Sequence, residues 1–274
     1  MRISLSLFFL LTFQALAFAA GGSFSPDRIT RGITAEGSCA VVGMSAEQSQ
    51  LTALQRARAA AIEQAAGVGV SSSTLVTDFK LAADFIKTYS KGYVVREKVE
   101  WLPLGQYQKD SSMAPIPEYR VRIVADVYVP EPKIKPLGLQ AKSNNAVYRC
   151  GETARMEVRT GAKAKIAVFN IMANDEVVML FPNEYDKCNL ASQKEPLVFP
   201  GKDSSTELVM QTLPGHERDA EAFFVVALDA TYPKEFTDYF AAGRAMRLEE
   251  FFRRYAEIAD YAEDAIVTYE VVGK

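Results

Sequence analysis

Residues 118–136 read EYRVRIVADVYVPEPKIKP, and this stretch decides how the chain is divided. Apolar and polar side chains alternate over residues 119–129, which predicts a strand with one buried and one solvated face. Three prolines follow within residues 130–136. Proline has no backbone N–H and a fixed φ, so this segment suits neither a helix nor a sheet. We therefore predict a boundary between two domains, residues 28–130 and 137–274.

Upstream of this strand, the sequence predicts further strands that can pair with it and helices that can cover the sheet. The same alternation over residues 93–101 predicts a second strand, and residues 103–117 form the loop between the two. Ser45 with Gln48 three residues later is a capping box, which starts a helix. The remaining predicted elements are a first strand over residues 33–42 and a second helix over residues 75–89. The first domain is thus expected to hold two helices and a mixed or antiparallel sheet.

The second domain is predicted to be mostly short strands. Their density indicates a sandwich or a partly open barrel. Asn174 and Asp175 both tolerate positive φ and are expected to form a hairpin turn. Apolar residues at helical spacing from Leu248 to Ala259 predict a helix near the C-terminus, followed by a closing strand. The predicted fold class is α+β, with a β-rich, sandwich-like second domain and a C-terminal helix. The predicted strands cover residues 154–159, 164–171, 177–181, 197–199, 207–211 and 222–228.

The N-terminus has the pattern of a cleavable signal peptide over residues 1–19. Arg2 precedes an apolar stretch, and Ala17 and Ala19 form a small-x-small cleavage site. The stretch is shorter than the about 20 apolar residues of a membrane span. No cysteine stands directly after it, since the first is Cys39, so a lipid anchor is not expected. We predict a periplasmic protein without a transmembrane anchor; secretion or peripheral attachment to the outer membrane is the alternative.

The charge and residue types exclude several classes of function. There are 31 basic and 34 acidic residues without a basic cluster, so nucleic acid is not an expected partner. His216 is the only histidine, and no Gly-x-Ser-x-Gly motif is present. Arg253 and Arg254 interleave at helical spacing with carboxylates, which are therefore expected on a solvated, ion-paired face. These carboxylates are Glu249, Glu250, Asp260, Glu263 and Asp264. We predict no catalytic residue, no metal site and no cofactor.

Three cysteines are present, in a compartment that permits disulfides. Cys150 and Cys188 share the second domain, whereas Cys39 lies alone in the first. A Cys150–Cys188 disulfide is therefore the candidate, but it requires the segment after Pro182 to fold back toward Cys150. The bond needs a Cα separation below about 7 Å.

Two resemblances add to these predictions. The order strand, helix, helix, hairpin, with Ala57, Ala61 and Ala65 before GVGV at 67–70 and SKG at 90–92, resembles the N-terminal domain of the flagellar assembly protein FlgT and related envelope lipoproteins. That resemblance implies a non-catalytic assembly or interaction module. The second domain, with YRCGE at 148–152, VFNI at 168–171 and LFPN at 180–183, resembles an uncharacterised bacterial domain family without established catalytic residues.

These observations favour a non-catalytic envelope protein that acts as an interaction or assembly module, in flagellar or other surface assembly. The predicted partner is another envelope protein; its identity and the oligomeric state are left open. The candidate partner-binding loop contains Gln106, Tyr107, Gln108 and Met113, because function concentrates on loops that a rigid hairpin carries. A binder of a small molecule or cell-wall fragment is the alternative, with Tyr185, Tyr232 or Tyr239 lining its pocket. A hydrolase using His216 or Cys188 is the least favoured class.

Overall fold

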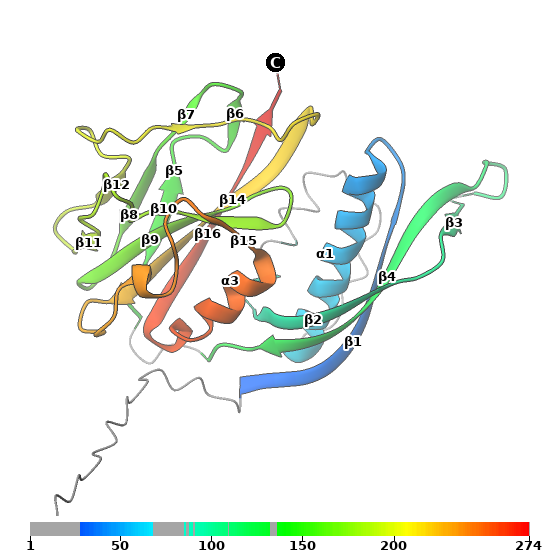
Figure 1. The fold of residues 1–274 in the computed structure, drawn as a ribbon, viewed down its shortest axis with the longest axis horizontal. Coiled ribbons are helices and arrows are strands. Elements are labelled where there is room, and N and C mark those ends of the chain that lie inside the picture. The colour runs from blue at the N-terminus through cyan, green and yellow to red at the C-terminus, as the bar shows by residue number, and fades with distance from the viewer. Residues whose placement is uncertain are drawn as a thin grey trace, which may run out of the picture.

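The structure is a computed structural model, and it describes residues 28–67, 85, 88–89, 91–108, 110–131 and 136–273. The predicted signal peptide lies outside the described residues. Figure 1 shows a β-rich body with a long ribbon of strands that extends away from it on one side. More of the described residues lie in strands than in helices. This agrees with the predicted α+β class and its β-rich second half.

The first unit is an antiparallel sheet with strand order β1-β4-β2, and β3 pairs with the outer part of β4. Helix α1 packs on β1 and β4. The predicted strands and the first helix are confirmed, with shifted ends for most of them. The elements are β1 (Ile29–Ala40), α1 (Ala46–Ala65), β2 (Tyr93–Trp101), β3 (Gly105–Tyr107) and β4 (Ile116–Tyr128).

Helix α1 begins at the predicted capping box and lies very close to the sheet. The Gln48 backbone N–H donates to Ser45 Oγ at 3.1 Å, and the Ser45 N–H donates to Gln48 Oε1 at 3.0 Å. The buried side of the helix carries small residues such as Ala53. A Cβ at Gly37 on β1 would lie 2.1 Å from the carbonyl oxygen of Ala53, so this approach requires glycine.

The predicted second helix, residues 75–89, lies mostly outside the described residues. Phe85 and Thr88 are helical, and Phe85 and Tyr89 are buried. The two rings meet edge to face with centroids 5.0 Å apart. The C-terminal end of the predicted helix therefore contributes to the core.

The second unit contains a large sheet with strand order β15-β10-β9-β14-β16-β6, with β11 attached to β9. Smaller sheets, β12-β8-β5 and β13-β7, accompany it. The predicted C-terminal helix is confirmed as α3 (Leu248–Tyr255), and the predicted hairpin turn joins β9 to β10, with Asp175 at a φ of 63°. The strands are β5 (Gln140–Ser143), β6 (Val147–Arg149), β7 (Thr153–Ala154), β8 (Met156–Arg159), β9 (Ala164–Ile171), β10 (Glu176–Phe181), β11 (Leu190–Ala191), β12 (Leu197–Phe199), β13 (Leu208–Val209), β14 (Arg218–Asp229), β15 (Ala245–Arg247) and β16 (Ala262–Val272), and the short 3-10 helices are η2 (Phe236–Asp238) and η3 (Ala259–Tyr261).

The large sheet is buried on both faces, which explains the continuous apolar run in β14. Phe223 and Val225 belong to a core shared with Met156 of β8, so one face packs toward the smaller sheets. Phe224 and Val226 alternate with them and therefore point to the other face. That second face packs against α3 and the first unit.

One apolar core crosses between the two units, while the predicted domain boundary at residues 130–136 stays a prediction. The cluster that contains Val121 and Ile123 of β4 also contains Phe224 of β14 and Phe252 of α3. The Phe252 ring stacks on Tyr93 of β2 with centroids 4.9 Å apart. Residues 132–135 of the predicted linker lie outside the described residues. The two units therefore share one packed core.

No helix in the described part of the chain is long and apolar enough to cross a membrane.

Candidate functional site

The predicted partner-binding loop lies at the tip of the projecting ribbon. β2 and β4 run together away from the body, and the β3 label marks the outer part of this ribbon in Figure 1. Gln106 and Tyr107 belong to β3 and pair with Pro117 and Ile116 of β4. The ladder therefore extends further than predicted, and the connection that remains unpaired covers residues 108–115.

Hydrogen bonds within the tip hold the connection in a compact turn. Asp110 Oδ1 accepts from the backbone N–H and from the hydroxyl of Ser112, both at 2.8 Å. These bonds lower the pKa of Asp110. Gln108 Nε2 donates to the Met113 carbonyl oxygen at 2.7 Å. The Gln108 amide thus holds the turn together, and the role of this exposed residue in partner binding stays a prediction.

Large apolar side chains are exposed along the same ribbon. Trp101 is 46% exposed, Leu104 60% and Met113 51%. Trp101 stands opposite Val121 of β4, on the face of the sheet that carries α1. Because α1 packs mainly on β1 and β4, it leaves the outer part of β2 uncovered. Exposed apolar side chains gathered on one element are typical of a protein-binding surface.

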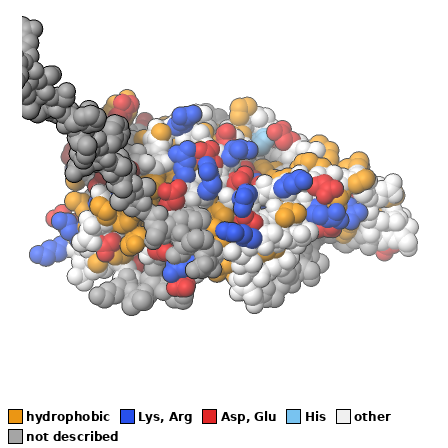
Figure 2. Space-filling model, turned by 60° about the horizontal axis from the view of Figure 1, so that its bottom comes forward, with side chains coloured by type: hydrophobic (Ala, Val, Ile, Leu, Met, Phe, Trp, Pro, Cys, Tyr) orange, Lys and Arg blue, Asp and Glu red, His pale blue; other side chains and the backbone are white. Residues whose placement is uncertain are grey.

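The opposite face of the ribbon carries ion pairs. Figure 2 shows basic and acidic side chains next to each other where the molecule narrows toward the ribbon. Arg122 donates to Glu36 at 2.8 Å, and Arg96 pairs with Asp126. Exposed pairs of this kind contribute little to stability. The face is therefore mixed in charge, which does not suit a polyanionic partner.

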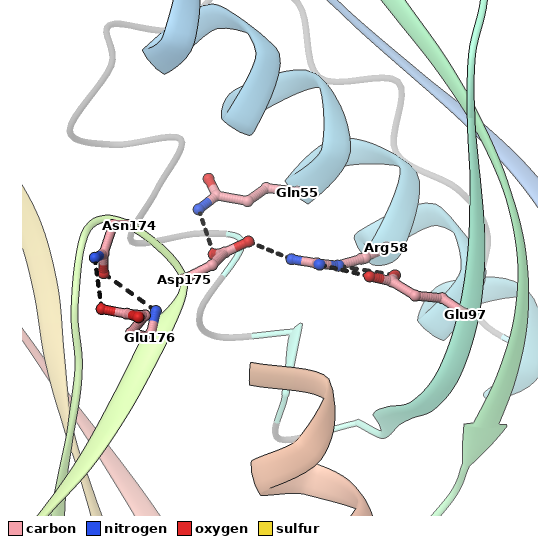
Figure 3. A network of polar contacts seen from close by, with 6 residues as sticks. All are labelled: Gln55, Arg58, Glu97, Asn174, Asp175 and Glu176. Carbon is pink, nitrogen blue, oxygen red and sulfur yellow. Dashed lines mark hydrogen bonds and ion pairs between the residues drawn. The ribbon is translucent and has the colours of Figure 1, made fainter. Parts of the chain in front are cut away.

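A buried ion-pair network joins the two units, and we call it the clasp: Gln55, Arg58, Glu97 and Asp175 (Figure 3). Arg58 of α1 donates to Glu97 of β2 through Nε at 2.9 Å and Nη2 at 2.6 Å. Its Nη1 donates to Asp175 at the tip of the β9–β10 turn, and Gln55 Nε2 donates to the same carboxylate at 3.1 Å. The clasp therefore fixes a turn of the second unit to the helix and sheet of the first.

The electrostatics of the clasp favour the charged form of Arg58. Burial alone would lower the pKa of Arg58, but the carboxylates of Asp175 and Glu97 outweigh it and raise the pKa. The sequence contains a signal that would have located this residue. Arg58 lies four residues after Leu54 and three before Ala61, so helical spacing places its charge next to apolar side chains on the same face of the helix.

Of the predicted carboxylate face, Glu250 forms the expected ion pair with Arg254 on α3, whereas Asp260 and Asp264 form a second polar contact between the units. Asp264 accepts from the hydroxyls of Tyr93 at 2.8 Å and Tyr255 at 2.9 Å. Asp260 accepts from Tyr128 at 2.7 Å. Burial and this hydrogen bond raise the pKa of Tyr128 to about 12. The helical spacing that suggested a solvated surface is absent here, because these residues lie in η3 and at the start of β16.

His216 lies in a turn, as predicted, but a carboxylate holds its ring. His216 Nδ1 lies 2.6 Å from Asp219 Oδ1, and the Leu213 N–H donates to the other carboxylate oxygen at 2.5 Å. No hydroxyl or thiol of a described residue is hydrogen-bonded to the remaining ring nitrogen of His216. A histidine–carboxylate pair without a nucleophile lacks an essential part of a hydrolytic triad. Among the described residues, no cluster of three or more His, Cys, Asp or Glu side chains could hold a metal ion.

The predicted Cys150–Cys188 disulfide is not formed, because the thiols of Cys150 and Cys188 are both free. The Cys150 backbone N–H donates to Val272, whose register partner is Arg218 at one end of β14. Cys188 precedes β11, which pairs with the start of β9 beside the other end of β14. A strand of this length separates the two thiols by roughly 30 Å, far beyond the reach of a disulfide. The strand order that places them apart could not be read from cysteine spacing.

The comparisons with known proteins concern the second unit. A family model described as a domain of unknown function, DUF4384, matches residues 147–219. The match includes the Leu-Phe-Pro-Asn element on which the predicted resemblance rested. No curated protein matches the chain. The resemblance of the first unit to the flagellar assembly protein stays a prediction.

Proposed function

We propose that this protein is a non-catalytic interaction module of the cell envelope that binds another protein through its ribbon. The exposed apolar side chains of the ribbon, Trp101 and Leu104 above all, are the observation that carries the proposal. Aromatic side chains dominate the binding energy of protein interfaces because they bury a large area with few rotatable bonds. The mixed-charge face beside them fits a protein partner better than a nucleic acid.

The rigid attachment of the ribbon supports this role. The clasp and the shared core fix β2 and β4 to the second unit, so the ribbon is presented in one orientation. A preformed surface binds with a smaller loss of conformational entropy than a flexible one. Assembly of a flagellum or of another surface structure in the periplasm is the context that we propose, on the basis of the N-terminal signal pattern and the resemblance of the first unit.

The test replaces Trp101 and Leu104 together by serine and recovers partners from intact envelope by affinity pull-down with mass spectrometry. We expect recovery of the specific partner to fall at least tenfold, a loss of about 1.4 kcal/mol of binding free energy. Val209→Ser is the matched control, because Val209 is also 46% exposed but lies in β13 of the second unit. Equal recovery by the wild-type and ribbon variants, with both folded, would contradict the proposal.

A further inference from the structure

A pocket of about 640 Å³ lies in the second unit, away from the ribbon. It forms where the start of β9 meets the segment after β10 and the segment after β14. The predicted tyrosines Tyr185, Tyr232 and Tyr239 do not line it. Its polar lining includes Lys163, Lys165, Asn183, Lys187, Glu235 and Thr237.

Lys165 is the buried cation of this pocket, and its charge is already compensated. Its side chain is about nine-tenths buried. The ammonium lies 2.6 Å from Glu235 Oε1 and donates to the backbone carbonyl oxygens of Tyr232 at 2.9 Å and Lys234 at 3.0 Å. These contacts hold the segment that follows β14 in place, and this segment forms one wall of the pocket. A ligand would therefore find Lys165 and Glu235 as a neutral pair.

With Lys165 paired to Glu235, the positive charge available to a ligand comes from Lys163 and Lys187. Neither forms an ion pair with any residue that the structure describes. Asn183 Oδ1 accepts from the Tyr185 and Asp186 N–H groups at 2.9 and 2.7 Å, which shapes the turn that carries Lys187. Glu184 is the other acidic residue of the lining, so three lysines face two glutamates. The pocket thus has an excess of positive charge.

The rest of the lining sets the size and polarity of a ligand. Pro182, Leu190, Ala230 and Ala242 add apolar surface, and the lining contains no aromatic ring for stacking on a sugar. The volume lies within the range of about 300–1,000 Å³ that is typical of small-molecule sites. A ligand that fits carries an anionic group on a short apolar body.

We propose that this pocket binds a small organic oxyanion, a carboxylate or a phosphate ester, through Lys163 and Lys187. The proposal is independent of the ribbon, because the two surfaces share no residue. Each ammonium would donate a charge-assisted hydrogen bond to the anion, and such bonds are stronger than neutral ones. Binding is expected to weaken as salt screens the two exposed lysines.

Backbone amide NMR of the full mature chain, titrated with glutarate and separately with glycerol 3-phosphate, tests the proposal. We expect saturable shifts at pocket residues with at least one of the two anions and none with glutaramide, the neutral analogue of glutarate. The double variant Lys163→Met, Lys187→Met should raise the Kd at least tenfold. Lys194→Met is the matched control, an exposed lysine outside the pocket, and should leave the Kd unchanged.

Three results would overturn the proposal. One is the absence of saturable shifts with either anion at concentrations of about 10 mM, which corresponds to a binding free energy weaker than about 3 kcal/mol. Another is an unchanged Kd in the folded double variant, and the third is an equal loss of binding in Lys194→Met. A preference for one of the two anions identifies the headgroup. The ribbon variants serve as a further control and should bind the anion as the wild type does.

Discussion

Replacing Arg58 by alanine is expected to lower the free energy of unfolding by about 3–5 kcal/mol. The substitution leaves Glu97 and Asp175 buried without their counter-ion, and the desolvated carboxylates repel each other. For a chain of this size the loss corresponds to a fall in Tm of about 10 °C. Thermal unfolding followed by circular dichroism measures it.

Arg122→Ala is the matched control for this prediction. Arg122 also pairs with two carboxylates, Glu36 and Glu100, but its side chain is 42% exposed. Its loss should cost no more than about 1 kcal/mol. Equal shifts for the two arginine variants would show that the clasp contributes no more than an ordinary surface pair.

Phe252→Ala is expected to cost about 3–5 kcal/mol and to destabilise both units together. Phe252 belongs to α3 of the second unit, but its ring contacts Tyr89 and Tyr93 of the first, with centroids 4.4 and 4.9 Å away. It also meets Phe224 of the large sheet at 5.8 Å. The cavity left by the ring would therefore open at the centre of the shared core.

Trp101 allows the unfolding of the first unit to be followed separately, because it is the single tryptophan and lies in β2 of that unit. Its fluorescence reports the first unit, and far-UV circular dichroism reports the whole chain. Both unfolding transitions should shift to lower denaturant concentration and should coincide in the variant. A tryptophan transition that keeps its wild-type midpoint would show that the first unit folds independently of α3.

The periodic elements of the fold were predictable from the sequence, because their burial follows the local pattern. Residues 164–171 and 197–199 form β9 and β12 as predicted, and the Ser45 capping box starts α1. The shared core was not predictable. The run at 222–228 indicates a strand buried on both faces, but it contains no information on which element covers the second face. The first unit and α3 cover it, and neither is adjacent to β14 in the chain.

The hairpin that carries the candidate site was predictable, but the contacts at its tip were not. Residues 103–117 were expected to connect the two strands, and the structure shows that part of this connection is itself paired as β3 and β4. The Gln108 amide closes the turn through the Met113 carbonyl oxygen, a contact that no sequence pattern indicated. Asp175 was expected only to form a turn. Its contact with Arg58 spans 117 residues of sequence, and no local pattern specifies a contact at that distance.

Photo-crosslinking in intact envelope tests the central claim, that the ribbon is the surface that binds a protein partner. A photoreactive phenylalanine analogue replaces Trp101 in one variant and Val209 in another, two positions with the same exposed fraction of 46%. The account predicts discrete adducts with a specific protein from position 101 and none from position 209. Identical adducts from both positions, or no adduct from position 101 in a folded and abundant variant, would contradict it.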